Sequence, residues 1–235
     1  MRNHTSSTAR ILFFGRAKCD ASETLLKALK NYKFDVTYVE SKGRGEKLPK
    51  DILRWKGEYI ICFRSLFILP GALIDNAKIA AINFHPGPPE YPGSGCVNFA
   101  LYDDAKEYGV TAHIINEKVD NGDILEVRRF PINSTDNLLK VLARTHDELL
   151  KLCSDFIHKL SSVGEGVIEE MKSASKHEKW IGKAKLMKEL ELLSTVSLDV
   201  SKTELERIIR ATYIKGYPPK IKMHGYAFYL KLDES

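Results

Sequence analysis

The sequence predicts an α/β protein: a mostly parallel sheet with helices on both faces, followed by a small C-terminal subdomain of a helix and a β-hairpin. Two observations carry this prediction. Short apolar segments alternate with amphipathic ones as far as Ile132, an order typical of parallel strands joined by covering helices. The tail beyond carries helix and hairpin signals instead, and its roughly 50 residues are too few for an independent core.

The elements of the main sheet follow in order along the chain. Six segments rich in apolar or β-branched residues are expected to be strands: 10–15, 36–40, 58–63, 79–84, 110–116 and 124–132. Four segments with apolar residues at helical spacing are expected to be helices: 22–32, 69–76, 96–106 and 134–160. Three further segments are expected to be loops: 41–49, 164–166 and 172–182.

The C-terminal part has its own signals. Ser201 or Thr203, with Glu204 following, predicts the start of a helix over 201–211. The segment 220–232 alternates around His224-Gly225 and predicts a hairpin. The chain is therefore divided into a loose tail over 1–9, a main catalytic domain over 10–175 and a small subdomain over 176–235.

The N-terminal segment and the longest apolar region indicate no membrane association. The segment MRNHTSSTAR is polar and lacks the apolar stretch of a signal peptide. The apolar region 59–74 is interrupted by Arg64 and Pro70, so it does not predict a membrane span. We expect a cytoplasmic protein without a membrane partner.

The four cysteines, Cys19, Cys62, Cys96 and Cys153, are scattered and form no CxxC pair. Reduced, buried thiols are favoured over a disulfide framework or a metal site. No cluster of Cys and His has the spacing of a zinc site, so no metal is expected.

The formal charge of +5 is unevenly distributed. From Lys172 to the C-terminus there are 13 Lys and Arg against 8 Asp and Glu, and the rest of the chain has 23 of each. A phosphorylated ligand or RNA would suit this excess. A solvated helical face with interspersed Glu suits it equally well.

The segment with the most chemical content is INFHPGPPEYPG, from Ile82 to Gly93. It places the amide of Asn83 and the imidazole of His85 at the end of an apolar strand, before a loop rich in proline and glycine. Alternation along a strand puts these two side chains on the same side. Ligands of such sheets sit beyond the carboxyl ends of the strands, so we expect the pair at the ligand crevice.

A carboxylate is supplied by Asp120 in the turn VDNGDIL. An amide donor, a titratable ring and a carboxylate are the groups needed to transfer an acyl group onto an amine. Asn83 could donate to the oxyanion, and His85 could donate as an imidazolium or accept a proton as the neutral ring. Asp120 could orient the ring and favour its charged form if the two loops meet.

Each of these residues also has a purely structural interpretation. A single histidine at a strand end is more often structural, an Asx-rich turn is more often a hairpin connection, and Asn83 could merely satisfy backbone groups. His113 lies inside a strand and is expected to be packed. The remaining histidines lack a partner base or metal-ligand spacing: His4, His146, His158, His177 and His224.

The region from Ile60 to Ile132 resembles the formyltransferases that use N10-formyltetrahydrofolate. Four motifs occur in the order of that family: Asn83-Phe84-His85-Pro86, Tyr91-Pro92-Gly93, Gly109-Val110-Thr111 and Asp120-Asn121-Gly122-Asp123. The resemblance implies a Rossmann-like sheet and a triad of Asn83, His85 and Asp120. It also implies that the folate is a cosubstrate rather than a tightly held cofactor.

The same resemblance assigns binding residues. The folate pterin is expected between two walls, formed by Phe67, Ile68 and Leu69 and by Val119, Asn121 and Gly122. The acceptor is expected at a second set of residues: Pro86, Gly87, Tyr91, Gly93 and Tyr217.

The chain departs from the family pattern after His85-Pro86. It reads Gly87-Pro88-Pro89-Glu90 where many members have Ser-Leu-Leu-Pro, so the donor is better defined than the acceptor. The first strand is not followed by GxGxxG, since Gly15-Arg16-Ala17-Lys18 does not match, which argues against a nicotinamide dehydrogenase.

Three acceptor amines occur in the family: methionyl-tRNA, glycinamide ribonucleotide and nucleotide-linked amino sugars. The tail with IIRA at 208–211 and YPP at 217–219 is similar to the short C-terminal segment of sugar N-formyltransferases. It favours a nucleotide-linked 4-amino or 3-amino deoxysugar of a bacterial O-antigen as the acceptor. The family resemblance also implies a homodimer. Four alternatives stay open: methionyl-tRNA as acceptor, glycinamide ribonucleotide as acceptor, hydrolysis of the formyl-folate, and a catalytically silent module that binds a sugar nucleotide or folate. A nucleic-acid partner is not expected.

Overall fold

The computed structural model describes residues 8–232, so the tail predicted for 1–9 lies almost entirely outside the described residues. Six strands form one sheet in the order β2-β1-β3-β4-β5-β6. Their bounds are β1 Arg10–Arg16, β2 Asp35–Ser41, β3 Gly57–Phe63, β4 Ala77–His85, β5 Glu107–Ile114 and β6 Ile124–Pro131. β1 to β4 are parallel, whereas β5 is antiparallel to both β4 and β6. The predicted α/β fold with a mostly parallel sheet is confirmed, because only β5 runs against the others.

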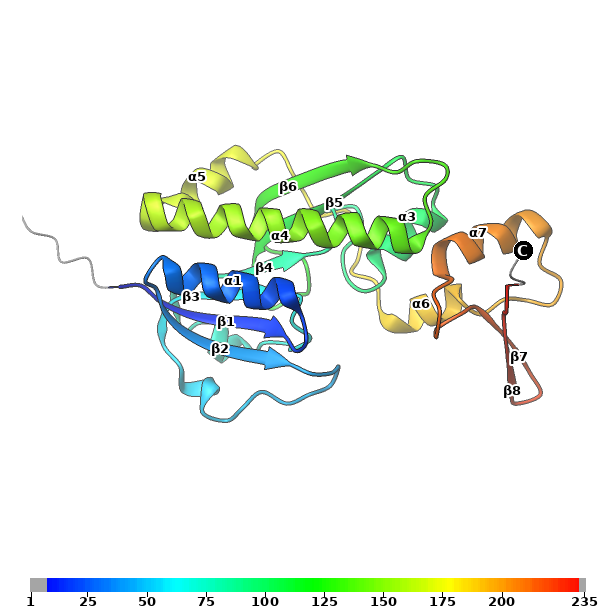
Figure 1. Ribbon diagram of the computed structural model, residues 1–235, viewed down its shortest axis with the longest axis horizontal. Coiled ribbons are helices and arrows are strands. Elements are labelled where there is room, and N and C mark those ends of the chain that lie inside the picture. The colour runs from blue at the N-terminus through cyan, green and yellow to red at the C-terminus, as the bar shows by residue number, and fades with distance from the viewer. Residues whose placement is uncertain (1–7, 233–235) are drawn as a thin grey trace, which may run out of the picture.

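One face of the sheet is covered by three helices, α1 Asp20–Asn31, α4 Leu138–Val163 and α5 Val167–Ala174 (Figure 1). Leu25 of α1 and Phe156 of α4 are buried there against Phe13 and Phe84 of the sheet. The opposite face is covered by short elements, the 3-10 turn η1 Ile52–Arg54 and α2 Gly71–Ile74, with the loops beside them. Trp55 is the largest side chain of that second apolar layer.

The central strand β1 shows why the sheet has two layers. Ile11 and Phe13 face the helical layer, whereas Leu12 and Phe14 face the layer around Trp55. All four side chains are fully buried. A strand buried on both faces is a continuous apolar run in the sequence, which is what residues 11–14 show.

The C-terminal subdomain contains α6 Met187–Leu193, α7 Lys202–Thr212 and a two-stranded hairpin of β7 Lys220–Met223 and β8 Tyr226–Tyr229. Helix α7 begins after Ser201, whose side chain accepts from the Glu204 N–H, as predicted. The hairpin turn has His224 and Gly225 at positive φ, the geometry that two-residue hairpin turns require. α7 packs on α3 Cys96–Tyr102, where Asn98 Nδ2 donates to the Ala211 carbonyl at 2.7 Å.

Several helix ends differ from prediction for local reasons. The helix expected from residue 134 begins at Leu138, because Asn137 caps it by accepting from the Lys140 N–H. The helix expected as far as 106 ends at Tyr102, and Asp104 adopts a left-handed φ of 53°. Helices α5 and α6 were not predicted, since α5 is eight residues long and α6 seven, and short helices depend on tertiary packing.

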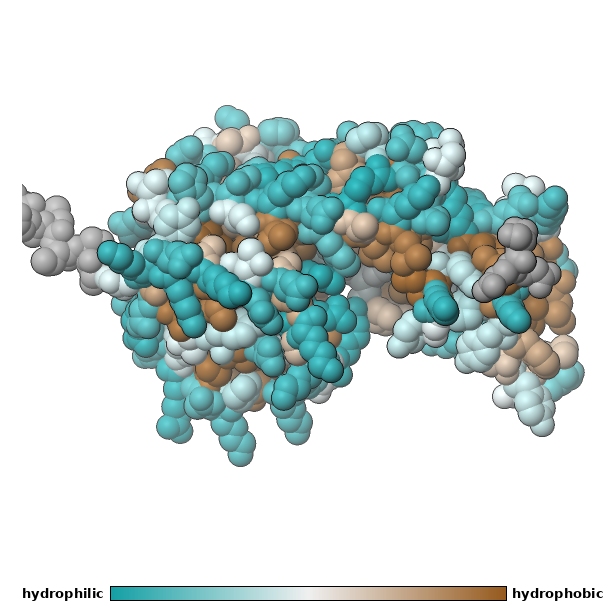
Figure 2. All heavy atoms as spheres, viewed as in Figure 1, coloured by the Kyte–Doolittle hydropathy of each residue, from teal (hydrophilic) through white to brown (hydrophobic). Residues whose placement is uncertain are grey.

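Figure 2 shows hydrophobic side chains at the surface of the C-terminal subdomain. β8 is exposed along its whole length, with Tyr226 and Tyr229 at 72% and 63% exposure.

The four cysteines are buried and free. Among residues 8–232, no helix is long and apolar enough to cross a bilayer. Over the same residues, no group of three or more His, Cys, Asp or Glu is placed to hold a metal ion.

Candidate active site

The end of β4 directs two polar side chains away from the helical layer. Ile82 and Phe84 are buried in the layer of α1 and α4, so the alternating residues Asn83 and His85 lie on the opposite side of the strand, as predicted. β5 pairs with this end of β4 and places His113 directly across from Asn83. Two histidines and an amide therefore come together where the parallel part of the sheet meets its antiparallel part.

The turn between β5 and β6 brings Asp120 to these residues. Asp120 has a φ of +44°, a left-handed conformation that Asp tolerates better than most residues and that often occurs at functional sites. The turn lies close against β5, because a Cβ on Gly122 would come within 1.9 Å of the Ile114 carbonyl oxygen. The sequence did not establish whether the Asp120 turn reaches the segment of Asn83 and His85, and in the structure it does.

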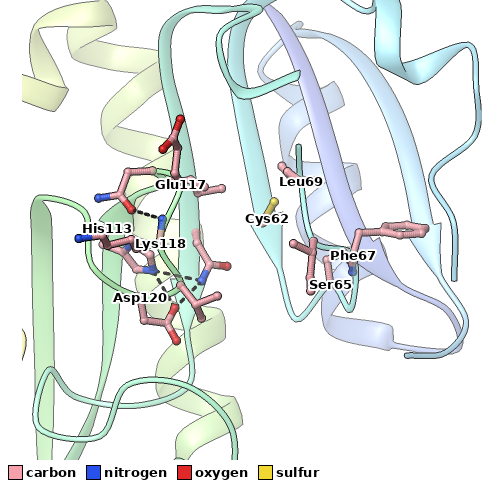
Figure 3. Close-up of a pocket in the computed structure, with 13 residues that line it drawn as sticks. Cys62, Ser65, Phe67, Leu69, His113, Glu117, Lys118 and Asp120 are labelled. Carbon is pink, nitrogen blue, oxygen red and sulfur yellow. Dashed lines mark hydrogen bonds and ion pairs between the residues drawn. The ribbon is translucent and has the colours of Figure 1, made fainter. Parts of the chain in front are cut away.

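Asp120 is shared by both histidines. Its Oδ2 lies 3.2 Å from Nδ1 of His85, and its Oδ1 lies 3.3 Å from Nε2 of His113 (Figure 3). Asn83 Nδ2 donates to Oδ1 at 3.5 Å. The backbone N–H of Gly93 donates to Oδ2 at 2.8 Å. The Gly93 N–H and the Asn83 amide donate to this carboxylate, and Nδ1 of His85 is placed to do the same, so these three groups stabilise its charge.

The surroundings of His85 favour the imidazolium. Nδ1 faces Asp120, and Nε2 faces the Tyr91 carbonyl oxygen at 3.1 Å, so both nitrogens have acceptors for a proton. Burial by itself would lower the pKa of His85, but the Asp120 charge and hydrogen bonds to Cys96 and Tyr91 raise it to about 9. Burial alone would raise the pKa of Asp120, but His85, His113 and the Gly93 N–H lower it to about 2.

His113 is oriented by its own strand. Its Nδ1 donates to the Ile114 carbonyl at 2.8 Å, so Nε2 points at the cluster. Nε2 lies 3.1 Å from Asn83 Nδ2 and 3.3 Å from Asp120. A neutral His113 accepts from Asn83, and a charged one donates to Asp120. The sequence predicted a packed histidine here, and the side chain is indeed 2% exposed, but it is also a partner of Asp120.

The loop after His85 is fixed through its backbone. The Pro86 carbonyl accepts from Tyr108 Oη at 2.7 Å, and the Gly87 carbonyl accepts from Thr111 Oγ1 at 2.8 Å. Gly87 cannot carry a side chain without displacing its neighbours, because a Cβ there would lie 2.6 Å from His85 Nε2. Of the four predicted acceptor residues in this loop, Gly87 and Tyr91 lie against the imidazole, Gly93 contacts Asp120, and Pro86 follows His85 in the chain.

A pocket of about 180 Å³ opens beside Asn83, His113 and Asp120 (Figure 3). One wall is formed by Phe67, Ile68 and Leu69, and the other by the segment from Ile115 to Asp120. Ile68 is 85% exposed and Val119 is 59% exposed, which is unusual for apolar side chains that flank a polar cluster. Such a pocket, apolar at its walls and polar at its end, suits a flat heteroaromatic ligand.

Three predicted binding residues lie elsewhere. The pocket takes its described lining residues from 62–69, 83 and 113–120. Asn121 and Gly122 line a neighbouring hollow instead, together with Lys172 and Trp180. Tyr217 is 82% exposed on the C-terminal subdomain. The sequence resemblance thus brings Phe67, Ile68, Leu69 and Val119 to the pocket, but not these three residues.

The sequence missed two residues of the site. His113 could have been found from β-pairing alone, since it lies opposite Asn83 on an antiparallel neighbour. Trp180 packs edge-on against both His85 and His113, with ring centroids 5.8 and 5.0 Å apart. It lies in a segment expected to be a loop, and no local pattern distinguishes it.

The family follows from comparison with known proteins. Residues 9–157 match the formyl transferase family model. The chain belongs to the formyl transferase family. The match covers every strand of the main sheet and the whole Asn83–His85–Asp120 cluster.

Two relatives in this family have defined names. A methionyl-tRNA formyltransferase of Listeria monocytogenes is 38% identical over 121 residues, which are 51% of this chain and 38% of that protein. GDP-perosamine N-formyltransferase of Brucella melitensis is 25% identical over 175 residues, which are 74% of this chain and 64% of that protein. The chain spans only about a third of the length of the methionyl-tRNA formyltransferases that it matches.

Two solved structures share the fold over nearly the whole chain. A sugar N-formyltransferase from a Shewanella species has a TM-score of 0.72 at 20% identity, covering 97% of this chain and 98% of that one. An N-formyltransferase from Helicobacter canadensis, solved with folinic acid and dTDP-3-aminofucose, has a TM-score of 0.65 at 14% identity. It covers 93% of this chain and 85% of that one. At these identities the comparison shows a common fold.

Proposed function

We propose that this protein transfers the formyl group of N10-formyltetrahydrofolate to the amine of a nucleotide-linked amino deoxysugar. The observation that carries the proposal is the buried cluster of Asn83, His85 and Asp120 at the end of a pocket with exposed apolar walls. An amide donor, an imidazolium and a carboxylate beside a pocket for a flat ring are the parts that this reaction needs.

The residues present fit the folate. The bound folate would supply an activated formyl group, and Ile68 and Val119 would cover the faces of its ring. These side chains are 85% and 59% exposed, so a ligand between them would remove apolar surface from water. Polar atoms of Asn83 and Asp120 close the inner end of the pocket, where the reacting atoms would lie.

The chemistry divides among the three residues. Attack of a neutral amine on a formyl carbon develops negative charge on the formyl oxygen. Asn83 Nδ2 lines the pocket and is a donor for that oxyanion. The imidazolium of His85 becomes a second donor when its Nε2–H leaves the Tyr91 carbonyl, which it contacts at 3.1 Å. A His85 pKa of about 9 keeps the ring charged at neutral pH, so His85 acts as a donor rather than as a general base. Asp120 holds this charge and accepts the proton of the attacking amine after the new carbon–nitrogen bond has formed. It would return that proton to N10 as the carbon–N10 bond breaks and tetrahydrofolate leaves.

The choice of acceptor is supported by how much of this chain each comparison covers. The fold comparison with sugar N-formyltransferases extends over the C-terminal subdomain, covering 97% of this chain and 98% of the Shewanella protein. The similarity to methionyl-tRNA formyltransferases is confined to about half of this chain. GDP-perosamine and dTDP-3-aminofucose, named with two relatives, are both nucleotide-linked amino sugars. A formylated sugar of this kind would serve O-antigen and lipopolysaccharide synthesis in the cytoplasm.

A homodimer is part of the proposal. Both strands of the C-terminal hairpin are largely exposed, and Tyr226, Phe228 and Tyr229 present aromatic rings to solvent. A two-stranded hairpin is marginal alone, so a second copy packed on it would stabilise the subdomain. Light scattering should give twice the chain mass, and Phe228→Ser should shift the protein towards the monomer. A wild-type monomer at micromolar concentration would contradict this part.

The reaction is tested by offering formyl-tetrahydrofolate with amino-sugar nucleotides, glycinamide ribonucleotide and methionyl-tRNA. Mass spectrometry should detect a formyl group on an amino-sugar nucleotide. A mass gain only on glycinamide ribonucleotide or tRNA would overturn the acceptor. Formate release without an amine would identify a hydrolase, and folate binding without turnover would identify a silent module.

A further inference from the structure

The segment 175–185, termed the strap, runs from the end of α5 across the loop that follows His85. At its start, Ser175 Oγ donates to the Leu125 carbonyl at 2.7 Å. Along its length, the N–H of Ile181 donates to the Pro89 carbonyl at 2.9 Å, and Lys185 N–H donates to the Pro92 carbonyl at 3.0 Å. The strap is therefore bonded to the loop by its backbone, like an added strand.

Gly93 connects the strap to the catalytic carboxylate. Its N–H donates to Asp120, and its neighbour Ser94 donates to the Lys185 carbonyl at 2.8 Å. A Cβ on Gly93 would lie 2.4 Å from backbone atoms of Lys185. Only a residue without a side chain allows the strap to approach this closely. A shift of the strap would therefore move Gly93 and change its hydrogen bond to Asp120.

An ion-pair group fixes the strap at its centre. Arg129 of β6 donates to both carboxylate oxygens of Glu178, at 2.5 and 2.8 Å. The same guanidinium donates to Glu90 of the loop at 3.0 Å. A two-pronged Arg–carboxylate contact fixes geometry as well as charge, and here it ties strap and loop to one sheet residue.

Trp180 is the strap residue that faces the cluster. Its ring lies edge-on to His85 at 5.8 Å and 72°, and to His113 at 5.0 Å and 85°. Its Nε1 donates to the Gly122 carbonyl at 2.8 Å, within the turn that carries Asp120. The two imidazoles are 3% and 2% exposed, whereas Trp180 is only partly buried. The indole is thus the layer between solvent and the two histidines.

We propose that Trp180 is a positioning residue for formyl transfer, which covers the two imidazoles against water and holds the Asp120 turn through the Gly122 carbonyl. This inference rests on the proposed function. An ion pair from which water is excluded is stronger than an exposed one. Trp180 therefore keeps His85 charged and aimed without touching the reacting atoms.

Exclusion of water also determines which nucleophile, the amine or water, attacks the formyl carbon. If water reaches the cluster, its oxygen can attack the formyl carbon, and the carbon–N10 bond breaks with a proton passing to N10. The products are formate and tetrahydrofolate, and the amine stays unmodified. A site covered by Trp180 should transfer with little formate release, and a site opened at this position should lose that coupling.

The test compares Trp180→Leu and Trp180→Phe with Trp55→Phe. Trp55 is the other of the two tryptophans and is buried in the apolar layer around η1, outside the cluster of His85, His113 and Asp120. Trp180→Leu should lower kcat about 10- to 100-fold, change the KM of the folate by less than about threefold and raise formate release per formyl transferred. Trp180→Phe keeps an aromatic cover without the N–H and should fall between. Trp55→Phe should retain the wild-type kcat and coupling.

A second readout does not depend on turnover. Histidine ring signals in NMR follow the protonation of His85, which faces Asp120 of the turn, Cys96 of α3 and, across Asp120, His113 of β5. In Trp180→Leu the His85 midpoint should move down towards its ordinary value of 6.5, because water weakens the pair with Asp120. Unchanged kcat, coupling and His85 midpoint in a folded Trp180→Leu would overturn the inference. Wild-type protein that formylates no amine would overturn the proposed function. The NMR comparison would still test whether Trp180 keeps His85 charged.

Discussion

Nδ1 of His85 lies 3.2 Å from Oδ2 of Asp120, and the two side chains are 4% and 7% exposed. The pair combines a carboxylate and an imidazolium in a place that water barely reaches. Two charges in such a setting stabilise one another only if their remaining hydrogen-bonding atoms are also satisfied. The Tyr91 carbonyl does this for His85, and the Gly93 N–H does it for Asp120.

The pair makes stability depend on pH. The pKa of His85 is raised from 6.5 to about 9, so its contribution is complete below pH 6.5 and is lost as the pH rises through about 9. The pKa of Asp120 is lowered from 3.8 to about 2, so its contribution is present above pH 3.8 and is lost as the pH falls through about 2. The joint contribution is therefore largest between these ranges, from about pH 4 to 6.5.

Urea unfolding should show this dependence on the alkaline side. Between pH 6.5 and 9 the free energy of unfolding should fall by on the order of 1–3 kcal/mol. His85→Asn, which cannot carry the charge, should lose most of that slope while retaining the fold. Equal slopes in the two proteins would mean that His85 is not charged in the native state.

Asn83 should matter for rate more than for folding. Its amide lies at the pocket and donates towards Asp120, so Asn83→Ala should lower kcat about 100- to 1,000-fold, as for loss of an oxyanion donor. The free energy of unfolding should fall by only about 1–2 kcal/mol. Asn98→Ala is the matched control, because that amide also makes a hydrogen bond, to the Ala211 carbonyl, at the interface between α3 and α7. Similar kcat values in the two variants would remove Asn83 from the chemistry.

Gly93 should tolerate no side chain. Its φ is +91°, and an added Cβ would lie 2.4 Å from the Lys185 backbone. Gly93→Ala should therefore destabilise the protein by about 1–3 kcal/mol and lower activity, since the strap and the hydrogen bond to Asp120 shift together. Gly43→Ala places a methyl group in open space and should leave the thermal midpoint and kcat near wild type. A stable, fully active Gly93→Ala would contradict the described path of the strap.

Ile68 should contribute to folate affinity and to little else. It is 85% exposed, so Ile68→Ser should leave the free energy of unfolding nearly unchanged. Burial of this side chain under a bound ring is worth about 1–2 kcal/mol, so the KM for formyl-tetrahydrofolate should rise roughly tenfold. Leu139→Ser, at an exposed position of α4, should not change that KM. Equal KM values would place the folate elsewhere.

Much of the fold could be predicted because its signals are local. Residues 11–14 of β1 form a continuous apolar run, and Ser201 caps α7 through the Glu204 N–H. The ends of α3 and α4 could not be placed, because they depend on turns such as the one at Asp104. The parallel and antiparallel neighbours of each strand depend on long-range pairing, so the reversed direction of β5 was not evident either.

The site was predictable to the same depth. Alternation placed Asn83 and His85 on one side of β4, and the family motif supplied Asp120. The role of His113 needed the pairing of β4 with β5. Trp180 could be assigned to the site only from its hydrogen bond to Gly122, which is 58 residues away in sequence. The intervening residues show no pattern that predicts this contact.

These sequence separations imply an order of assembly. Tyr91 meets His85 across 6 residues and Asp120 meets Asn83 across 37, whereas the strap closes a longer loop onto a surface that must already exist. Longer loops cost more entropy to close, so the strap is expected to dock last and to be the first part to open. A protease that cuts within 175–185 should therefore cleave molecules whose triad is assembled but not yet covered, and should spare those with the strap docked. The rate at which protection from cleavage appears during refolding would give the rate of this last step.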